Sequence, residues 1–108
     1  MIHYYLREIY LQDTDAAGIV FFSRVLTLCH EAYEACLKRS GVDLSQLVAQ
    51  GIILPIVATE CQFKRPMIWG ETMTFNLLPE LLGENKFVVN YLFYFHFVLI
   101  DIFTIKIY

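Results

Sequence analysis

The sequence predicts an α+β domain in which one long helix packs across a curved antiparallel sheet. Two observations support this class. Apolar side chains in residues 23–39 recur at intervals of three and four, which is the period of an amphipathic helix. The other apolar segments are strand-like, and turn residues separate them, as in successive antiparallel strands.

The long helix is predicted to lie between a first strand and a short second helix. Residues 2–11, rich in Ile, Tyr and Leu, form the expected first strand, and the turn chemistry of residues 12–18 ends it. Ser23 is the expected N-cap of the helix 23–39, and Gly41 is its expected C-terminal stop.

A short helix and three further strands complete the predicted fold. Asp43 is placed to cap a helix over residues 44–50, which Gly51 ends. Residues 83–85, Gly-Glu-Asn, form the expected hairpin turn between the last two strands. The three predicted strands span residues 52–63, 72–82 and 86–95.

Length and composition predict one domain that associates with itself. A chain of 108 residues makes a single domain, residues 1–108, and buries only about two thirds of its unfolded surface. Its hydrophobic fraction is 57%, above the roughly 45–50% that is usual for globular domains, so we expect an oligomer. The net charge is −3 without any run of basic residues, which excludes nucleic acid as a partner.

The N-terminus and the cysteines indicate a cytoplasmic protein. Residues 1–5 lead directly into strand-like sequence, without the charged flank and apolar core of a signal peptide. Cys29, Cys36 and Cys61 form neither a C-x-x-C pair nor an even set. We therefore expect buried, reduced thiols.

Residues 13–22 place two acids before a small-residue turn that leads into the long helix; they are Asp-Thr-Asp-Ala-Ala-Gly-Ile-Val-Phe-Phe. The N–H groups of a first helical turn carry partial positive charge. A carbonyl oxygen docked there would be polarised beside an acid that can attack it or activate water, which suits acyl transfer. The alternative is structural, since acids are common in turns and at helix starts.

This segment, with Tyr10 and Leu11 before it, resembles the signature of the hotdog-fold acyl-CoA thioesterases of the 4-hydroxybenzoyl-CoA type. That signature, Asp-x-Asp-x-x-Gly-x-Val followed by two aromatic residues, is intact here through Phe22. Residues 29–34, Cys-His-Glu-Ala-Tyr-Glu, resemble the cyanobacterial and plant branch that hydrolyses 1,4-dihydroxy-2-naphthoyl-CoA for phylloquinone (vitamin K1) biosynthesis. The similarity covers residues 3–95.

The resemblance implies a hotdog fold and a thioester hydrolase that uses no cofactor. Asp15 is then the catalytic carboxylate, as nucleophile or as general base for water, while Asp13 bonds turn amides. The backbone N–H of Phe22 is the implied oxyanion donor, and Gly18 lets the acyl group approach closely. Family members pair two sheets edge to edge with active sites at the interface, so we expect a homodimer and, from it, a homotetramer.

Four nearby residues are candidates for binding the acyl-CoA substrate. Phe21 and Leu54 are expected to line an aromatic acyl pocket, with core packing as the alternative. Lys64 and Arg65 are expected to meet the CoA phosphates, with unpaired surface cations as the alternative.

The helix segment that begins at His30 is not expected to bind a metal. It lacks the second histidine of the zinc motif H-E-x-x-H, because Glu34 stands in that place. Glu31 is expected to be solvated helix surface, with a role at the active site of a neighbouring subunit as the alternative.

Residues 96–108 depart from the family pattern, which ends in a strand carrying small residues, Thr and His. Either this tail substitutes as the last strand, or the chain is truncated or frameshifted. The apolar run between Asn90 and Asp101 is shorter than the ~20 residues that span a bilayer, which favours a strand over an anchor. The altered tail leaves an alternative function open, namely a non-catalytic acyl-CoA-binding hotdog domain or an inactive copy.

Overall fold

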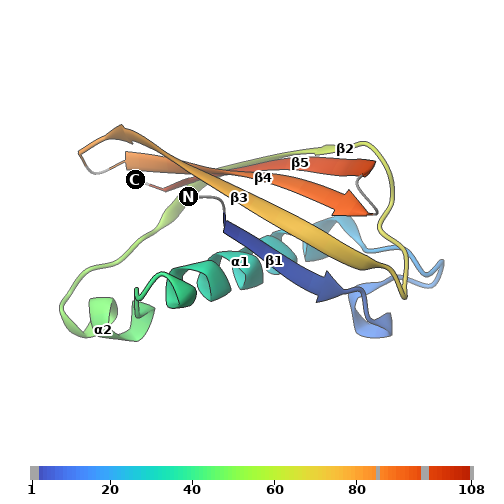
Figure 1. Ribbon diagram of the computed structural model, residues 1–108, viewed down its shortest axis with the longest axis horizontal. Helices are drawn as coiled ribbons and strands as arrows, with labels where there is room; N and C mark the ends of the chain where they lie inside the picture. The colour runs from blue at the N-terminus through green and yellow to red at the C-terminus, as the bar shows by residue number, and fades with distance from the viewer. Residues whose placement is uncertain (1–2, 85, 96–97, 108) are drawn as a thin grey trace.

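The long helix α1 (Phe22–Arg39) lies along one face of a five-stranded antiparallel sheet in the computed structural model (Figure 1). The structure describes residues 3–84, 86–95 and 98–107. The strand order across the sheet is β1-β3-β4-β5-β2. The elements are β1 (His3–Glu8), the 3-10 turn η1 (Leu11–Asp13), α1 (Phe22–Arg39), α2 (Leu44–Ala49), β2 (Ile56–Phe63), β3 (Thr72–Gly83), β4 (Lys86–Phe95) and β5 (Val98–Ile107).

The predicted helices are confirmed, but their caps differ in one respect. Helix α1 begins at Phe22, so Ser23 lies inside the first turn and the prediction that it is the N-cap is wrong. Phe21 occupies the N-cap position, and no described side chain caps it. Gly41 has the left-handed φ of +84° that a helix stop requires, as predicted. The Asp43 side chain accepts hydrogen bonds from the amides of α2, which confirms it as the cap.

Two predicted strands are too long. The first ends at Glu8, because the next residues turn into η1, and residue 2 lies outside the described residues. The strand predicted over 52–63 begins only at Ile56. Pro55 precedes it and has no N–H to donate to a ladder, which accounts for the later start.

The tail of the chain supplies a strand inside the sheet. Strand β5 pairs antiparallel with β4 on one side and with β2 on the other. Phe103 marks this position, since its Cα partners are Tyr91 of β4 and Cys61 of β2. Among the described residues, no helix is long and apolar enough to cross a membrane.

The hydrophobic core lies between α1 and the strands β3 and β4. Alternate residues of the two strands point toward the helix, and the rings of Phe75 and Phe93 meet with centroids 4.7 Å apart. The helix contributes one continuous apolar stripe, which includes two of the cysteines expected to be buried. The stripe consists of Val25, Leu28, Cys29, Ala32, Tyr33 and Cys36.

A nearly buried ion pair joins β1 to η1. Arg7 Nη1 lies 2.6 Å from Asp13 Oδ2, and the two side chains are only 11% and 5% exposed. Asp13 also accepts the N–H of Tyr10 at 2.8 Å, which confirms the expected bond to a turn amide. Burial opposes ionisation of Asp13, but the Arg7 and Tyr10 hydrogen bonds prevail and hold its pKa below the usual value.

The lowered pKa of Asp13 predicts a loss of stability in acid. The unfolded chain takes up a proton on Asp13 at a higher pH than the folded chain does, so the contribution of this group disappears as the pH falls through both values. Asp13→Asn should cost about 3 kcal/mol at pH 7, because it removes one partner of a nearly buried pair. The free energy of unfolding of the variant should also depend less on pH between about pH 5 and pH 2.

Urea unfolding at several pH values measures both effects. Glu34→Gln is the matched control, because Glu34 is an exposed carboxylate on α1. An equal pH dependence of the free energy of unfolding in wild type and Asp13→Asn would contradict the lowered pKa of Asp13.

Candidate active site

The turn that follows η1 holds the side chain of Asp15 in a defined orientation. Its Oδ1 accepts the N–H groups of Ala17 and Ile19, at 2.9 and 3.3 Å. The backbone N–H of Asp15 donates to the carbonyl of Ile19 at 2.9 Å, which closes the loop. Asp15 is exposed, and Oδ1 takes both of these turn bonds, so a carboxylate stands at the surface with its orientation already set.

Gly18 makes this turn possible through its backbone conformation. Its φ is +75°, a region that residues with a Cβ rarely adopt. A Cβ added here would meet no described atom within 4 Å, so the protein itself leaves open space over this residue. The Gly18 carbonyl accepts the N–H of Trp69 at 3.0 Å, which anchors the turn to the loop before β3.

The first turn of α1 begins directly after this loop. Phe22 is its first residue, so the Phe22 N–H has no acceptor within the helix. The side chains of Phe21 and Phe22 are both exposed, and their rings lie with centroids 4.8 Å apart. The predicted oxyanion donor is therefore at a helix start where no side chain of the described residues competes as a cap.

A surface hollow of about 270 Å³ lies against this helix start. It brings Phe22 together with Lys64 and Arg65, three of the predicted site residues. Asp15, Gly18, Phe21 and Leu54 are not among its lining residues, and Leu54 packs partly buried against the core. The hollow is lined by Ile19, Val20, Phe22, Val25, Phe63, Lys64, Arg65, Pro66 and Met67.

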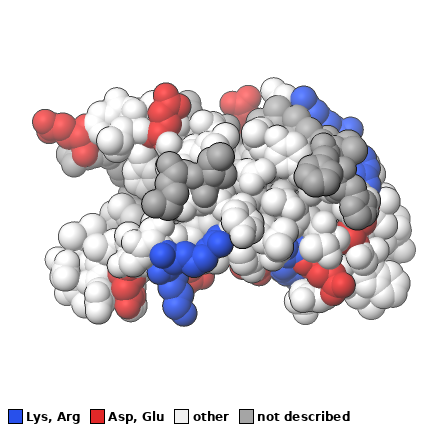
Figure 2. Space-filling view, in the orientation of Figure 1, with Lys and Arg blue, Asp and Glu red and all other residues white. Residues whose placement is uncertain are grey.

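The two predicted phosphate-binding cations differ in their surroundings. Arg65 Nη2 lies 2.5 Å from Glu71 Oε2, and the guanidinium stacks 5.2 Å above the ring of Phe95. Glu71 was not identified from the sequence; it also accepts the N–H of Ile68 at 2.8 Å. Lys64 is exposed at the rim of the hollow. On the face drawn in Figure 2, the basic side chains form small separate groups and no continuous basic surface.

The helix segment around His30 has a mixed environment. His30 and Glu34 are exposed, whereas Glu31 is half-buried and accepts hydrogen bonds from Tyr5 and Arg7. The expectation that Glu31 is only solvated helix surface is therefore wrong. Within the described part of the chain, no three His, Cys, Asp or Glu side chains gather closely enough to hold a metal ion.

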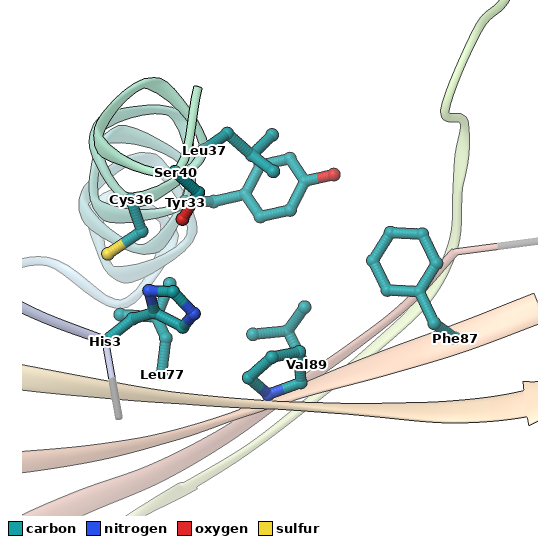
Figure 3. Close-up of a pocket in the computed structure, with 9 residues that line it drawn as sticks. His3, Tyr33, Cys36, Leu37, Ser40, Leu77, Phe87 and Val89 are labelled. Atoms are coloured by element: carbon teal, nitrogen blue, oxygen red, sulfur yellow. The ribbon is translucent and has the colours of Figure 1, made fainter. Parts of the chain in front are cut away.

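A second cavity, of about 90 Å³, lies between the C-terminal half of α1 and the sheet (Figure 3). The ring of Tyr33 points into it, and the buried hydroxyl has no hydrogen-bond partner among the described residues. Burial raises the pKa of Tyr33. Tyr33 is roughly 16 Å along α1 from Phe22, so this cavity is separate from the hollow at the helix start.

Comparison with known proteins identifies the family of the chain. A family model described as the thioesterase-like superfamily matches residues 9–103. The 1,4-dihydroxy-2-naphthoyl-CoA hydrolase of Picosynechococcus sp. is 46% identical over 92 residues, which are 84% of this chain and 63% of that protein. The hydrolase of the same name from Trichodesmium erythraeum is 42% identical, over 84% of this chain and 67% of the relative.

A solved structure supports the same relationship. The 1,4-dihydroxy-2-naphthoyl-CoA thioesterase from Synechocystis superposes with a TM-score of 0.92 at 29% identity, covering 99% of this chain and 80% of that one. The chain spans 63% of the length of the Picosynechococcus relative, slightly less than two thirds. The family match covers most of the chain and the superposition covers nearly all of it. The chain therefore belongs to the thioesterase-like superfamily and has the hotdog fold.

Proposed function

We propose that this chain hydrolyses an aromatic acyl-CoA thioester, and that the substrate is 1,4-dihydroxy-2-naphthoyl-CoA in phylloquinone biosynthesis. The observation that carries the proposal is the exposed Asp15 carboxylate, held by two turn amides just before the uncapped start of α1. The substrate is inferred from the names of the cyanobacterial relatives, which are 1,4-dihydroxy-2-naphthoyl-CoA hydrolases.

Asp15 can act on a thioester in two ways. As a nucleophile it attacks the carbonyl carbon, expels CoA as the thiolate and leaves a mixed anhydride, which water then hydrolyses. As a general base it takes a proton from a water molecule that attacks the same carbon. The hydrogen bonds to Oδ1 suit either route, because they fix the carboxylate without using Oδ2.

The N–H of Phe22 is the proposed donor to the oxyanion. Attack on the carbonyl moves negative charge to its oxygen, and the N-terminal turn of a helix stabilises such charge. Because this donor belongs to the main chain, its position depends on α1 and not on the identity of the side chain. The reaction uses a carboxylate, an amide and water, and so needs no metal or cofactor.

The hollow beside Phe22 is the proposed entry for the substrate. Phe22, with Phe21 next to it, offers aromatic surface for an aromatic acyl group, and Lys64 offers a cation for CoA phosphates. Arg65 is held by Glu71, so it would meet a phosphate only by sharing or exchanging that partner. Leu54 remains a proposed acyl contact, and the open space over Gly18 is where the thioester would approach.

We also propose that two copies of the chain pair through β2. This strand is at the edge of the sheet, and nearly every residue in it is exposed. Ile56, Val57 and Phe63 are exposed apolar side chains on this edge. An exposed apolar edge strand is a template for pairing with another chain, and a second β2 extends the sheet. A homotetramer would form from two such dimers.

A cytoplasmic location fits this proposal. Cys29 and Cys36 are both free thiols buried on α1. Free thiols persist in the reducing cytoplasm, and burial makes them unreactive.

Asp15→Asn should remove nearly all hydrolysis and preserve the fold. The amide oxygen of Asn can still accept the N–H groups of Ala17 and Ile19, but the side chain can neither attack nor accept a proton. We expect a loss of about 100-fold to 10,000-fold in kcat. CoA release from 1,4-dihydroxy-2-naphthoyl-CoA and from benzoyl-CoA, followed with a thiol reagent, measures the effect.

His30→Gln is the matched control, because His30 is exposed on α1 and has no part in the proposed chemistry. It should change kcat little, and a metal chelator should change nothing. A well-folded wild type without turnover would support the alternative, a binding domain or an inactive copy. If Asp15→Asn does not fold, the role of Asp15 is structural.

Val57→Lys should convert the proposed dimer into a monomer. A lysine on an edge strand opposes edge-to-edge pairing, and Val57 is 49% exposed on β2. Val48→Lys is the control, because Val48 is 62% exposed on α2, away from the sheet edge. Light scattering on both variants gives their masses. A dimer that survives Val57→Lys would place the interface elsewhere.

A further inference from the structure

We propose that Arg7 is a positioning residue for Asp15, and that it holds the turn carrying this acid against α1. The inference rests on the proposed thioesterase activity, because it concerns the geometry of that same site. Arg7 belongs to β1 and reaches neither the hollow at the helix start nor the turn amides of Asp15. Its effect on the reaction therefore passes through its two acidic partners.

The guanidinium of Arg7 lies between carboxylates from two different elements. Two of its nitrogens meet the two oxygens of Asp13, at 2.6 and 3.1 Å. Its Nε donates to Glu31 Oε2 at 2.9 Å. The planar fork of an arginine matches a carboxylate in one orientation, so the Asp13 contact fixes direction as well as distance.

One residue connects Asp13 to Asp15. That residue, Thr14, is bonded twice, because its N–H and its hydroxyl both donate to the carbonyl of Leu11, at 3.0 and 2.8 Å. Asp13 in turn accepts the N–H of Tyr10, so the segment from Tyr10 to Thr14 is closed by its own hydrogen bonds. A shift of Asp13 therefore moves Asp15 with it.

Glu31 connects Arg7 to the oxyanion donor. It lies nine residues after Phe22 on the continuous helix α1, roughly 13 Å along the axis. Glu31 Oε2 also accepts the hydroxyl of Tyr5 at 2.6 Å. Burial and this hydrogen bond raise the pKa of Tyr5 to about 12, which keeps the phenol protonated as a donor. Arg7 thus ties the segment that carries the acid to the helix that carries the N–H.

Arg39 provides a matched control within the same chain. It is the last residue of α1, and its guanidinium donates to the carbonyl of Tyr4 on β1. It lies over the ring of Tyr4 at 5.4 Å, much as Arg7 lies over the ring of Tyr10 at 4.7 Å. Arg39 therefore joins the same strand and helix at the end remote from Asp15.

The test compares Arg7→Met with Arg39→Met in steady-state hydrolysis of 1,4-dihydroxy-2-naphthoyl-CoA. Arg7→Met should lower kcat by about tenfold to a hundredfold, because the turn that carries Asp15 is then no longer held against α1. KM should stay within about twofold, since Arg7 does not touch the substrate. Arg39→Met should leave kcat within about twofold. In the Asp15→Asn background, Arg7→Met should lower kcat no further.

Arg7→Lys gives the same answer if the Met variant does not fold. It retains the charge but loses the fork, so its kcat should fall below that of the wild type while KM stays within about twofold. An unchanged kcat in the Arg7 variants, or an equal loss in Arg39→Met, would overturn the proposal.

Amide hydrogen exchange separates this inference from the proposed function. If the wild type hydrolyses no thioester, the proposed function fails, and the amides of Ala17 and Ile19 still report on the turn. Faster exchange at both amides in Arg7→Met, with wild-type rates in Arg39→Met, supports a positioning role. Equal rates in the two variants refute it.

Discussion

The packing of one apolar stripe of α1 against β3 and β4 is the constraint on which the candidate site depends. The first residue of the stripe is Val25, three residues after the helix begins at Phe22. The first turn of α1 therefore extends beyond the core and stays exposed, with amides that the helix itself cannot satisfy. Burial of the stripe fixes this turn in space, so the core determines where the proposed oxyanion donor lies.

The turn that carries Asp15 is positioned by different contacts. Local hydrogen bonds shape the turn from Asp15 to Ile19, but contacts distant in sequence set its location. Gly18 and Val20 bond to Trp69 and Met67 in the loop before β3. The proposed site is therefore organised before substrate arrives, and little reorganisation would be needed when charge develops on the carbonyl oxygen.

Features that depend only on residues close in the sequence were predictable from the sequence. The period of α1, the cap at Asp43 and the glycine at position 41 each depend on neighbours within one turn. The motif that contains Asp15 could also be identified, because its residues are contiguous in the sequence. The start of α1 was misjudged because Ser23 is a good N-cap in isolation, whereas the chain enters the helix one residue earlier.

The contacts of Arg7 and Glu71 could not be predicted in the same way, because their partners come from other elements. In β1, His3, Tyr5 and Arg7 alternate with exposed residues, so a charged side chain occupies an inward position of the strand. Such a charge needs a buried counter-ion. The sequence offered several acids, and only the folded chain shows that Asp13 and Glu31 supply it.

The strand order has a consequence for synthesis of the chain on the ribosome. Strand β2 is made before β3 and β4, but its sole neighbour in the described sheet is β5, which follows both of them in the chain. Until residues 98–107 emerge, Ile56 and Phe63 sit on a strand with no partner at either edge within the nascent chain. Pairing that must wait for a distant segment is slow, and an unpaired apolar strand is prone to aggregation meanwhile. Chaperone demand during translation should therefore be set by β2, the same strand whose free edge is the proposed dimer contact.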